Sequence, residues 1–403
     1  MKLVIAPDSF KEVAPAEAVA EAVARGWAAV WPDTELVLVP MADGGEGTLE
    51  ALAGGGRGEL VELEVTGPMG APVQACFGLL DGGGTAVIEA AQANGLHLVP
   101  EARRDPSRAT TRGVGELIRA ALDRGARRLI IGVGGSATND GGAGMARALG
   151  VTLCGAEGRE LPDGGGALGE LYRVDCAGLD TRLAQTELWV ACDVDNPLCG
   201  PSGASLVYGP QKGADPAMAA RLDRALARFA AVVERDTGIV LRDLPGAGAA
   251  GGLAAGLVAF CGARLTPGVE LVAREAGLEG HVRDADLVIT GEGSLDGQSL
   301  RGKVPVGVAR IAARHGVPVI ALAGRIAGSL DGLYAEGVTA AFALAEGPMT
   351  REESMRDTLA LAERKAAMIA RLWRAAGVST FFGVIECPKR DGDIQPTQRR
   401  RPE

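Results

Sequence analysis

Carboxylate residues occur in five short segments of this sequence, each after a run of apolar residues, and three of these segments also contain glycine. These segments are residues 8–11, 43–48, 134–142, 192–197 and 291–296. Asp, Asn and Gly are ordinary turn residues, so any one segment can be explained as a turn. Their repeated position after apolar runs instead indicates one site built from several loops. Such a site suits a polyanion and a metal ion.

Phosphoryl transfer requires this combination of residue types. Glycine allows backbone N–H groups to crowd around phosphate oxygens. Mg²⁺ is usually held by one or two carboxylates together with the phosphates. A lysine can neutralise charge on the transferred group, and a carboxylate can accept the proton of the attacking hydroxyl. The loops therefore predict a metal-dependent kinase that acts on a small molecule.

Lysine is rare in this sequence, because arginine carries nearly all of the positive charge. Three of the few lysines, Lys11, Lys212 and Lys303, lie inside segments rich in glycine and aspartate. A compact and mobile point charge suits a position beside phosphate. Each of these lysines can equally be an ordinary surface residue, so the sequence leaves both interpretations open.

Residues 297–303 match the spacing G-x-x-x-x-G-K of a P-loop, but the next residue is Val304. A P-loop needs Ser or Thr there to reach Mg²⁺, so a standard P-loop is not expected. Lys303 is still predicted to face phosphate, with a lysine at a helix start as the alternative. Arg325 follows a glycine at another predicted strand end and could clamp a carboxylate.

Residues 132–137 match G-x-G-x-x-A, a weak fingerprint of dinucleotide binding. Asp140 would place negative charge near a pyrophosphate, and the preceding residues lack the usual entry to a Rossmann domain. NAD binding is therefore not expected. Residues 208–214 and 245–252 are less specific, since they could shape a carboxylate or nucleotide pocket or serve close helix packing.

Short β-branched runs alternate with Ala-rich amphipathic segments along most of the chain. The predicted strands are residues 2–7, 35–40, 127–132, 187–192, 286–291, 318–324 and 339–345. The predicted helices are residues 15–30, 253–261, 304–315, 351–376 and a segment after Glu46. This alternation is typical of βαβ units, in which helices cover a parallel sheet. Such sheets bind ligands outside the carboxyl ends of their strands, where the glycine- and carboxylate-rich segments lie.

Residues 58–90 differ from this pattern, because they have the alternation and turn residues of β-hairpins. The change predicts a second α/β domain inserted into the first, with the active site in the cleft between them. We expect residues 1–60 and 282–378 to form one parallel-sheet domain and residues 61–281 to form the inserted domain. Residues 379–403 lose all periodicity and are predicted to be a disordered tail.

The composition argues against several classes of function. A formal net charge of −10 disfavours nucleic-acid binding, which needs a basic surface. No apolar run reaches the ~20 residues of a membrane span, and the amino terminus lacks the form of a signal peptide, so a cytoplasmic protein is expected. The seven cysteines are expected to be free thiols. The three histidines are interpreted as surface or packing residues, which leaves no basis for a histidine metal site.

The ordered set of motifs resembles the glycerate kinase family of the bacterial type. The motifs are DSFK at 8–11, ADGGEGT at 42–48, GGSATNDGGAG at 134–144, CDVDNPL at 192–198, GPQKGA at 209–214, PGAGAAGG at 245–252 and GEGSLDGQSLRGK at 291–303. The resemblance covers nearly the whole chain to about residue 377. It implies phosphate transfer from ATP to glycerate, dependence on Mg²⁺, and 2-phosphoglycerate as product. It also implies that the domain formed by both chain ends is flavodoxin-like.

The candidate residues receive expected roles on this basis. ATP and Mg²⁺ are expected at loops 134–142 and 291–303, with glycerate in the cleft between the domains. Asp193 or Asp195 would orient or deprotonate the attacking hydroxyl, and Lys303 would steady the transferred phosphoryl group. The expected nucleotide-binding residues are Gly134, Gly135, Ser136, Asn139, Gly291, Gly293 and Ser294. The expected substrate-binding residues are Asp8, Ser9, Lys11, Asp43 and Arg325, and the expected metal ligands are Asp140, Glu292 and Asp296.

Two alternatives stay open at the level of sequence. A kinase for another small hydroxy acid or polyol would use the same loops. A nucleotide-binding protein without catalysis would use only those loops that bind the nucleotide. The sequence also leaves open which hydroxyl is phosphorylated, which carboxylate is the base, and whether the protein forms a homodimer.

Overall fold

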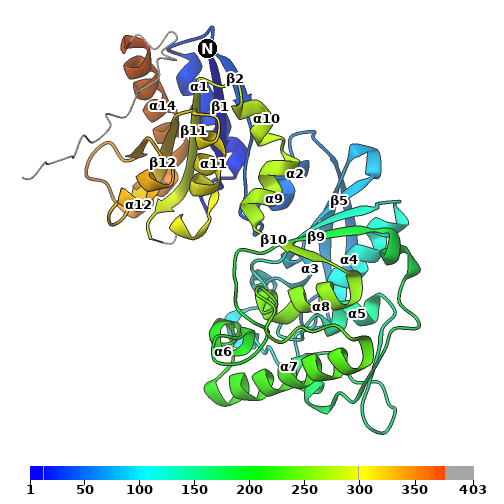
Figure 1. Ribbon diagram of the computed structural model, residues 1–403. Helices are drawn as coiled ribbons and strands as arrows, with labels where there is room; N and C mark the ends of the chain where they lie inside the picture. Colours follow the sequence, from blue (N-terminus) through cyan, green and yellow to red (C-terminus); the bar gives the residue numbers. More distant parts are fainter. Residues whose placement is uncertain (12, 298, 377–403) are drawn as a thin grey trace, which may run out of the picture.

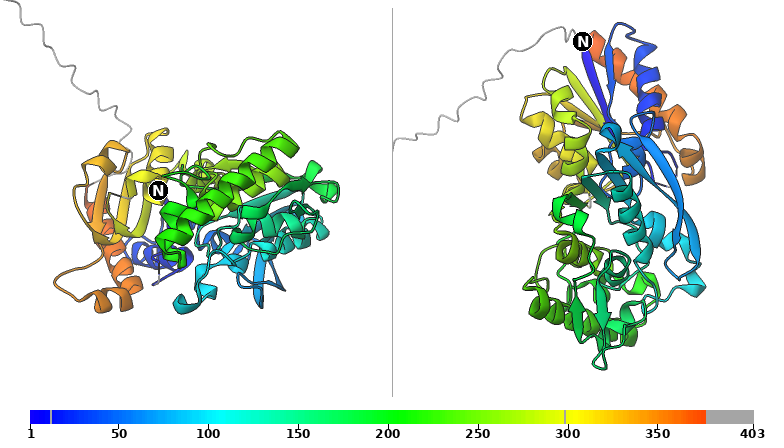
Figure 2. Two further views of the ribbon diagram at one scale, coloured as in Figure 1. Left: turned by 90° about the horizontal axis from the view of Figure 1, so that it is seen from below. Right: turned by 90° about the vertical axis from the view of Figure 1, so that its right-hand side faces the viewer.

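The computed structural model describes residues 1–11, 13–297 and 299–376. The predicted tail, residues 379–403, lies outside the described residues. Two large β-sheets lie toward opposite ends of an elongated molecule (Figure 1; Figure 2). Three helices lie between the sheets: α2 (Thr48–Ala53), α9 (Gly268–Glu275) and α10 (Leu278–Val282). Parallel strands and helices alternate along the chain, which confirms the predicted α/β class.

The five-stranded sheet is parallel throughout and combines both ends of the described chain. Its strands are β1 (Lys2–Pro7), β2 (Glu35–Leu38), β11 (Leu287–Leu295), β12 (Val319–Ile326) and β13 (Ala340–Ala343). Their spatial order is β13-β12-β11-β1-β2. Renumbered within this sheet and taken from the β2 edge, the order is 2-1-3-4-5, which is flavodoxin-like.

Alternating residues of β1 pack against helices on opposite faces of this sheet. Leu3 and Ile5 lie in one apolar cluster, and Val4 and Ala6 lie in another. Since both faces are covered, the strand is a continuous apolar run. The first face is covered by α1 (Ala16–Ala28) and α14 (Thr358–Ala375), and the second by α11 (Val304–Ala313). In Figure 2, α1 and α14 lie side by side although they come from opposite ends of the chain.

Two sequence predictions in this half of the molecule need correction. The predicted strand at 286–291 continues to Leu295, because residues up to Leu295 stay paired with β12. The predicted helix at 351–376 is two helices, α13 (Arg351–Arg356) and α14, which meet at Asp357. Asp disfavours helix interiors and favours helix starts; here its side chain pairs with Arg356. A further short helix, α12 (Asp331–Ala335), precedes β13.

The six-stranded sheet is mixed and has the order β10-β9-β6-β5-β4-β3. Its strands are β3 (Glu59–Thr66), β4 (Pro72–Leu80), β5 (Thr85–Glu89), β6 (Arg128–Gly132), β9 (Glu187–Ala191) and β10 (Arg264–Thr266). Strands β3, β4 and β5 are successive antiparallel neighbours, which confirms the predicted hairpins. Strands β6, β9 and β10 continue the sheet in parallel. A small antiparallel pair, β7 (Thr152–Cys154) and β8 (Arg173–Asp175), lies outside it.

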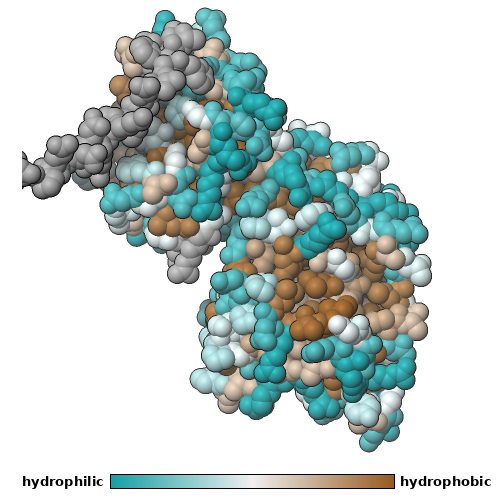
Figure 3. Space-filling view, viewed as in Figure 1, coloured by the Kyte–Doolittle hydropathy of each residue, from teal (hydrophilic) through white to brown (hydrophobic). Residues whose placement is uncertain are grey.

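The six-stranded sheet is also covered on both faces. On one face, Ile88 and Ile131 share an apolar cluster with the surrounding helices. These helices are α3 (Ala91–Asn94), α4 (Arg112–Asp123), α5 (Ala143–Ala148), α6 (Ala204–Tyr208), α7 (Pro216–Thr237) and α8 (Leu253–Cys261). Figure 3 shows hydrophobic residues gathered at the surface over the region of α8. On the other face, Val87 and Ile130 share a cluster with α2, α9 and α11, so apolar packing joins the two sheets.

The chain between β2 and β11 supplies every strand of the six-stranded sheet. The proposed division into domains at residues 60 and 281 stays a prediction, and β3 already begins at Glu59. Within the described ranges, no helix combines the length and apolar character that a membrane span needs. The cysteines of these ranges are all free thiols, as expected.

Candidate active site

A pocket of about 580 Å³ lies where the loops after several strands meet. Lys11 follows β1, Asp43 follows β2, Ser136 follows β6 and Asp193 follows β9, and all four line this pocket. The carboxyl ends of parallel strands lie at one edge of a sheet, and loops from both sheets contribute to this pocket. Four of the five predicted loops are therefore brought together.

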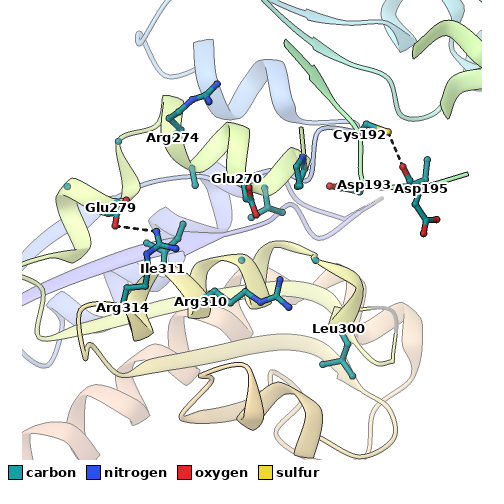
Figure 4. A pocket seen from close by; sticks show the side chains of 18 of the residues that line it. Cys192, Asp193, Asp195, Glu270, Arg274, Glu279, Leu300, Arg310, Ile311 and Arg314 are labelled. Atoms are coloured by element: carbon teal, nitrogen blue, oxygen red, sulfur yellow. Dashed lines mark hydrogen bonds and ion pairs between the residues drawn. The ribbon is translucent and has the colours of Figure 1, made fainter. Parts of the chain in front are cut away.

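A second pocket, of about 1270 Å³, adjoins the first, because residues 192–194 line both. It extends between α9 and α11, with Glu270 on the first helix and Arg310 on the second (Figure 4). Leu300 and Gly302, which follow the remaining predicted loop within segment 291–303, also line it. The two pockets thus form a continuous cleft lined by four of the predicted loops and by the segment that follows the fifth.

Two buried carboxylates, Asp8 and Glu292, lie at the switch point of the five-stranded sheet. Asp8 follows β1 and Glu292 lies in the adjacent β11, where the strand order reverses; open α/β sheets bind ligands at this point. Asp8 is only 2% exposed, and its Oδ1 accepts a 2.7 Å hydrogen bond from the backbone N–H of Ser9. Burial, supported by the negative charge of Asp43, raises the pKa of Asp8 to about 7.

Lys11 and Asp43 form an ion pair at the mouth of the smaller pocket. The Lys11 ammonium lies 3.3 Å from Oδ2 of Asp43, and the backbone N–H of Gly45 donates to Oδ1 of Asp43 over 3.1 Å. Burial lowers the pKa of Lys11, but the carboxylates of Asp43 and Asp8 outweigh burial and raise it. Lys11 therefore stays charged but is already partnered.

Glu292 is held between a cation and a hydroxyl. The Lys303 ammonium lies 3.3 Å from Oε2 of Glu292, and the hydroxyl of Ser299 donates to Oε1. Burial raises the pKa of Glu292, and Ser299 and Lys303 oppose that effect. Ser294, two residues along β11, donates to Asp296 over 3.2 Å. Lys303 thus lies beside a carboxylate at the first residue before α11, where a phosphate could replace or join its partner.

Asp193 and Asp195 have different surroundings. Asp193 lines both pockets, whereas Asp195 lines only the larger one. Oδ1 of Asp193 accepts a 2.7 Å hydrogen bond from the backbone N–H of Gly268. Burial, with a further contribution from Asp43, raises the pKa of Asp193 to about 7. A carboxylate with this pKa is suited to accept a proton near neutral pH.

Asp140 does not lie in either pocket, contrary to its expected role as a metal ligand. It is fully buried, and its two oxygens accept hydrogen bonds from Thr111, Gly142 and Gly144. These bonds hold the loop after β6 against the start of α4. Within the described residues, no group of three or more His, Cys, Asp or Glu side chains is arranged to hold a metal.

Glycines allow the loops of this site to touch one another. A Cβ atom on Gly134 would lie 2.8 Å from Cα of Gly45, and one on Gly44 would lie 2.4 Å from Cβ of Ala191. Gly135 has a φ of +72°, which residues with a Cβ atom rarely adopt. Gly134 is therefore required by contact with the loop that carries Gly45, and Gly44 by contact with the end of β9; the sequence pattern did not reveal these reasons.

The remaining candidates lie at different depths. Ser136 lines the smaller pocket, whereas Asn139 is fully buried and its amide donates to Ser205 over 2.9 Å, so it does not line the cleft. Gly291 and Gly293 lie within β11 instead of a loop, and a Cβ on Gly293 would lie 3.7 Å from Cα of Phe10. Arg325 is exposed near the end of β12 and lines neither pocket.

Sequence reasoning missed some residues of the cleft and left the role of Lys212 open. Glu89, at the end of β5, is buried and accepts a 2.8 Å hydrogen bond from the backbone N–H of Leu49. His97, interpreted as a surface or packing residue, lines the smaller pocket. Lys212, which the sequence left open between a neighbour of phosphate and a surface lysine, also lines this pocket and is buried. Nothing in the sequence pattern singled out Ser299 or Glu89.

Comparison with known proteins identifies the family. The model of the glycerate kinase family matches residues 3–374, nearly all of the described chain. The chain belongs to the glycerate kinase family. It is 50% identical over 370 residues to a protein of Bacillus subtilis strain 168 named glycerate kinase, covering 92% of this chain and 97% of the relative. It is 48% identical over 381 residues to glycerate 2-kinase of Escherichia coli K12, covering 94% of this chain and all of the relative.

A solved structure supports the fold of this glycerate kinase family member. The crystal structure described as glycerate kinase 2 of Salmonella typhimurium LT2 superimposes with a TM-score of 0.86 at 48% sequence identity. The match covers 94% of this chain and 99% of that chain, so it includes both sheets. The resemblance predicted from seven ordered motifs is thereby confirmed.

Proposed function

We propose that this protein transfers the terminal phosphate of ATP to glycerate in the cytoplasm, giving ADP and 2-phosphoglycerate. The observation that carries the proposal is the position of Asp193 in the wall shared by the two pockets. A base in that position can contact an acceptor in one pocket and the phosphate of a donor in the other. The family, and the names of the relatives from Bacillus and Escherichia, supply the identity of the acceptor.

The sizes of the pockets suggest which substrate each holds. Glycerate is a three-carbon acid and suits the smaller pocket of about 580 Å³. ATP is several times larger and suits the pocket of about 1270 Å³, in which Arg310 and Arg314 supply positive charge (Figure 4). The phosphate that is transferred would then lie near Asp193, with Lys11, which lines the smaller pocket, and Lys303 as candidate cations.

Asp193 would orient the attacking hydroxyl and accept its proton. Its pKa of about 7 leaves a large fraction ionised at neutral pH, so the proton can be accepted there. Lys303 would steady the transferred phosphoryl group, and Lys11 would balance the charge of the surrounding carboxylates. Because this transfer involves little covalent chemistry by the protein, its rate depends on positioning and charge.

We propose Asp8 and Asp43, with Glu292 close by, as the residues that hold Mg²⁺ together with phosphate oxygens of ATP. Carboxylate oxygens are the ligands that Mg²⁺ prefers, and two carboxylates plus phosphates are a usual set. Burial raises the pKa of Asp8, and the charges of Asp43 and Glu292 add to that effect, so three carboxylates lie within electrostatic reach of one another here. When bound, Mg²⁺ would offset charge on the phosphates.

Coupled detection of ADP with a panel of acceptors tests the proposal. Glycerate is expected to give a kcat/KM at least about tenfold higher than lactate, tartronate or glycerol. Equal rates with those acceptors would instead indicate a kinase for another hydroxy acid or polyol. Absence of ADP with every acceptor would indicate a nucleotide-binding protein without catalysis. Phosphorus NMR of the product then distinguishes 2-phosphoglycerate from 3-phosphoglycerate.

A further inference from the structure

Lys212 is a buried lysine without a carboxylate partner. Only 2% of it is exposed, and within the described residues no carboxylate oxygen lies within 4.0 Å of its ammonium group. Its Nζ donates to the hydroxyl of Ser136 over 3.0 Å and to the carbonyl oxygen of Thr138 over 2.7 Å. An ammonium group has three donors, so one remains for another acceptor. Lys212 also lines the smaller pocket.

A buried cation without a counter-charge is costly, and lysine is almost never fully buried unless it is paired. The other two loop lysines are paired already: Lys11 with Asp43 and Lys303 with Glu292. Lys212 is therefore the loop lysine that has no direct ion pair among the described residues, since buried Asp140 acts on it only from beyond 4.0 Å, and an anion from outside the protein could supply one. Arg325, the other cation expected to clamp a carboxylate, lies outside both pockets.

The loop beside Lys212 offers further donors. Gly134, Gly135 and Ser136 line the same pocket, and their backbone N–H groups donate to no other backbone or side-chain acceptor among the described residues. Gly135 has a left-handed conformation, with φ of +72°. Successive N–H groups around such a residue form the concave anion sites known as nests. Ser136 accepts from Lys212, so its own hydroxyl proton is free to be donated.

We propose that Lys212, with Ser136 and the N–H groups of residues 134–136, binds the carboxylate of the hydroxy-acid substrate and so selects an acid over a polyol. This subsite rests on the proposed function for the identity of the acid. The carboxylate would lie at this end of the smaller pocket, and the hydroxyl groups would extend toward Asp193, which lines the same pocket. Lys212 touches substrate in this arrangement and fixes its orientation.

Binding of a carboxylate to Lys212 should take up a proton. Burial lowers the pKa of Lys212 to about 7, and the charge of Asp140 only partly opposes this. At pH 8 the side chain of Lys212 is mostly neutral in the protein without ligand, and binding of an anion favours its protonated form. Apparent Kd for glycerate should then rise about tenfold per pH unit above ~7. Other ionisable groups that line the pocket are Lys11, Asp43, Glu46, Glu89, His97 and Asp193; burial also raises the pKa of Cys192 and of Tyr208 there.

Calorimetric titration of the full chain with glycerate, without ATP, tests the proposal. Titrations at pH 8 in two buffers of different ionisation enthalpy give the number of protons taken up. The wild type should take up about one proton at pH 8 and almost none at pH 6. Lys212→Met should lose that uptake and bind glycerate at least about 30-fold more weakly, because a buried charged hydrogen bond is lost. The matched control Lys365→Met, on α14, should behave as wild type.

Additional ligands identify the source of the anion. Titration with glycerol, which lacks a carboxylate, should be unaffected by Lys212→Met, and so should titration with ATP. If ATP affinity falls and glycerate affinity does not, the subsite holds phosphate and the proposal is wrong. Wild-type binding of glycerate without proton uptake at pH 8 would also overturn it.

Two further measurements distinguish loss of the carboxylate subsite from loss of folding and from failure of the proposed kinase activity. Lys212→Gln retains a hydrogen-bond donor without charge, so it provides a folded variant if Lys212→Met is unstable. The Tm of Lys212→Gln should match that of the wild type within a few degrees. Its affinity for glycerate should still fall. If the wild type forms no ADP from glycerate, the proposed function fails. Proton-linked binding of lactate or another hydroxy acid through Lys212 would still support the carboxylate subsite, and its absence would remove it.

Discussion

The carboxylate of Asp193 accepts a 2.7 Å hydrogen bond from the backbone N–H of Gly268. Gly268 is the first residue of α9, so this contact ties the end of β9 to the helix layer between the two sheets. The contact uses Oδ1; Oδ2 has no hydrogen-bond partner among the described residues. A helix start favours the carboxylate anion, whereas burial raises its pKa to about 7. Asp193 is thus held in one orientation with one oxygen available.

Asp193→Asn should lower kcat by about 10²–10⁴-fold, the usual contribution of a general base. Asn keeps an oxygen for the N–H of Gly268 but cannot accept the proton of the hydroxyl. KM for ATP should change by less than about threefold, as measured by steady-state kinetics. Asp195→Asn is the matched control, since Asp195 lines only the larger pocket. A larger loss of kcat in the Asp195 variant would transfer the role of base to Asp195.

The pH profile of kcat/KM for glycerate should have a maximum near pH 7. Asp193 must be ionised to act as base, so activity is lost as pH falls below its pKa of about 7. Lys212 must be protonated to hold the substrate, so activity is lost as pH rises above its pKa of about 7. Asp193→Asn should lack the acid limb, and Lys212→Gln should lack the alkaline limb. A profile that stays flat from pH 6 to pH 9 would contradict both assignments.

Asp8→Asn should stabilise the free protein at pH 8 while abolishing most activity. The folded-state pKa of Asp8, about 7, lies above its ordinary value of 3.8, so ionisation destabilises the folded state as pH rises from about 4 to 7. Asn removes that penalty and can still accept from the N–H of Ser9. The Tm at pH 8 should rise by a few degrees, at roughly 2–4 °C per kcal/mol.

Scanning calorimetry at pH 4 and pH 8 provides the check for Asp8. At pH 4 the folded carboxyl is protonated in the wild type, so the two proteins should melt within about 1 °C of each other. A Tm gain equal at both pH values would show that ionisation of Asp8 is not the cause.

Gly134→Ala should reduce activity strongly with a modest loss of stability. The new Cβ would lie 2.8 Å from Cα of Gly45, so the loop that carries Asp43 must move. Small displacements of positioning groups can cost ~10²-fold in rate. Gly169→Ala is the control, because a Cβ there meets nothing within 4 Å. If both variants retain wild-type kcat, contact between these loops does not position the site.

Arg325→Ala should leave KM for glycerate and kcat within about twofold of wild type. Arg325 is exposed and lines neither pocket, and surface substitutions of this kind usually change free energies by less than about 0.5 kcal/mol. Steady-state kinetics with varied glycerate measures both constants. An increase in KM of more than about tenfold would restore Arg325 as the carboxylate clamp.

The fold was predictable from the sequence where one hydrophobic pattern corresponds to one helix or one strand. The runs at 2–7 and 286–291 are strands because both faces are covered by helices, and their pairing follows from the parallel-sheet pattern. The exact extent of β11 was not predictable, because Gly291 and Gly293 resemble turn residues until β12 is present to pair with them. The break at Asp357 depended on local side-chain pairing within an otherwise helical pattern.

The site was predictable as a set of loops but not as a set of contacts. Strand ends converge, so Lys11, Asp43 and Asp193 were identified by position alone. Asp140 has a similar sequence context, yet it is buried in the core. Thr111, 29 residues earlier, donates two hydrogen bonds to its carboxylate there. Burial and long-range partners therefore separate pocket residues from structural ones, and neither is visible in one sequence.

The pairing of β1 with β11 also has a consequence for synthesis of the chain. The hydroxyl of Thr290 donates to the carbonyl of Ala6, a residue translated 284 positions earlier. At ~5–20 residues per second, β1 waits roughly 15–60 s for this neighbour, whereas the six-stranded sheet is complete once β10 has been made. Any polypeptide released from the ribosome before residue 287 therefore lacks Glu292 and Lys303. We expect such a fragment to be able to form the six-stranded sheet and to have no phosphotransferase activity.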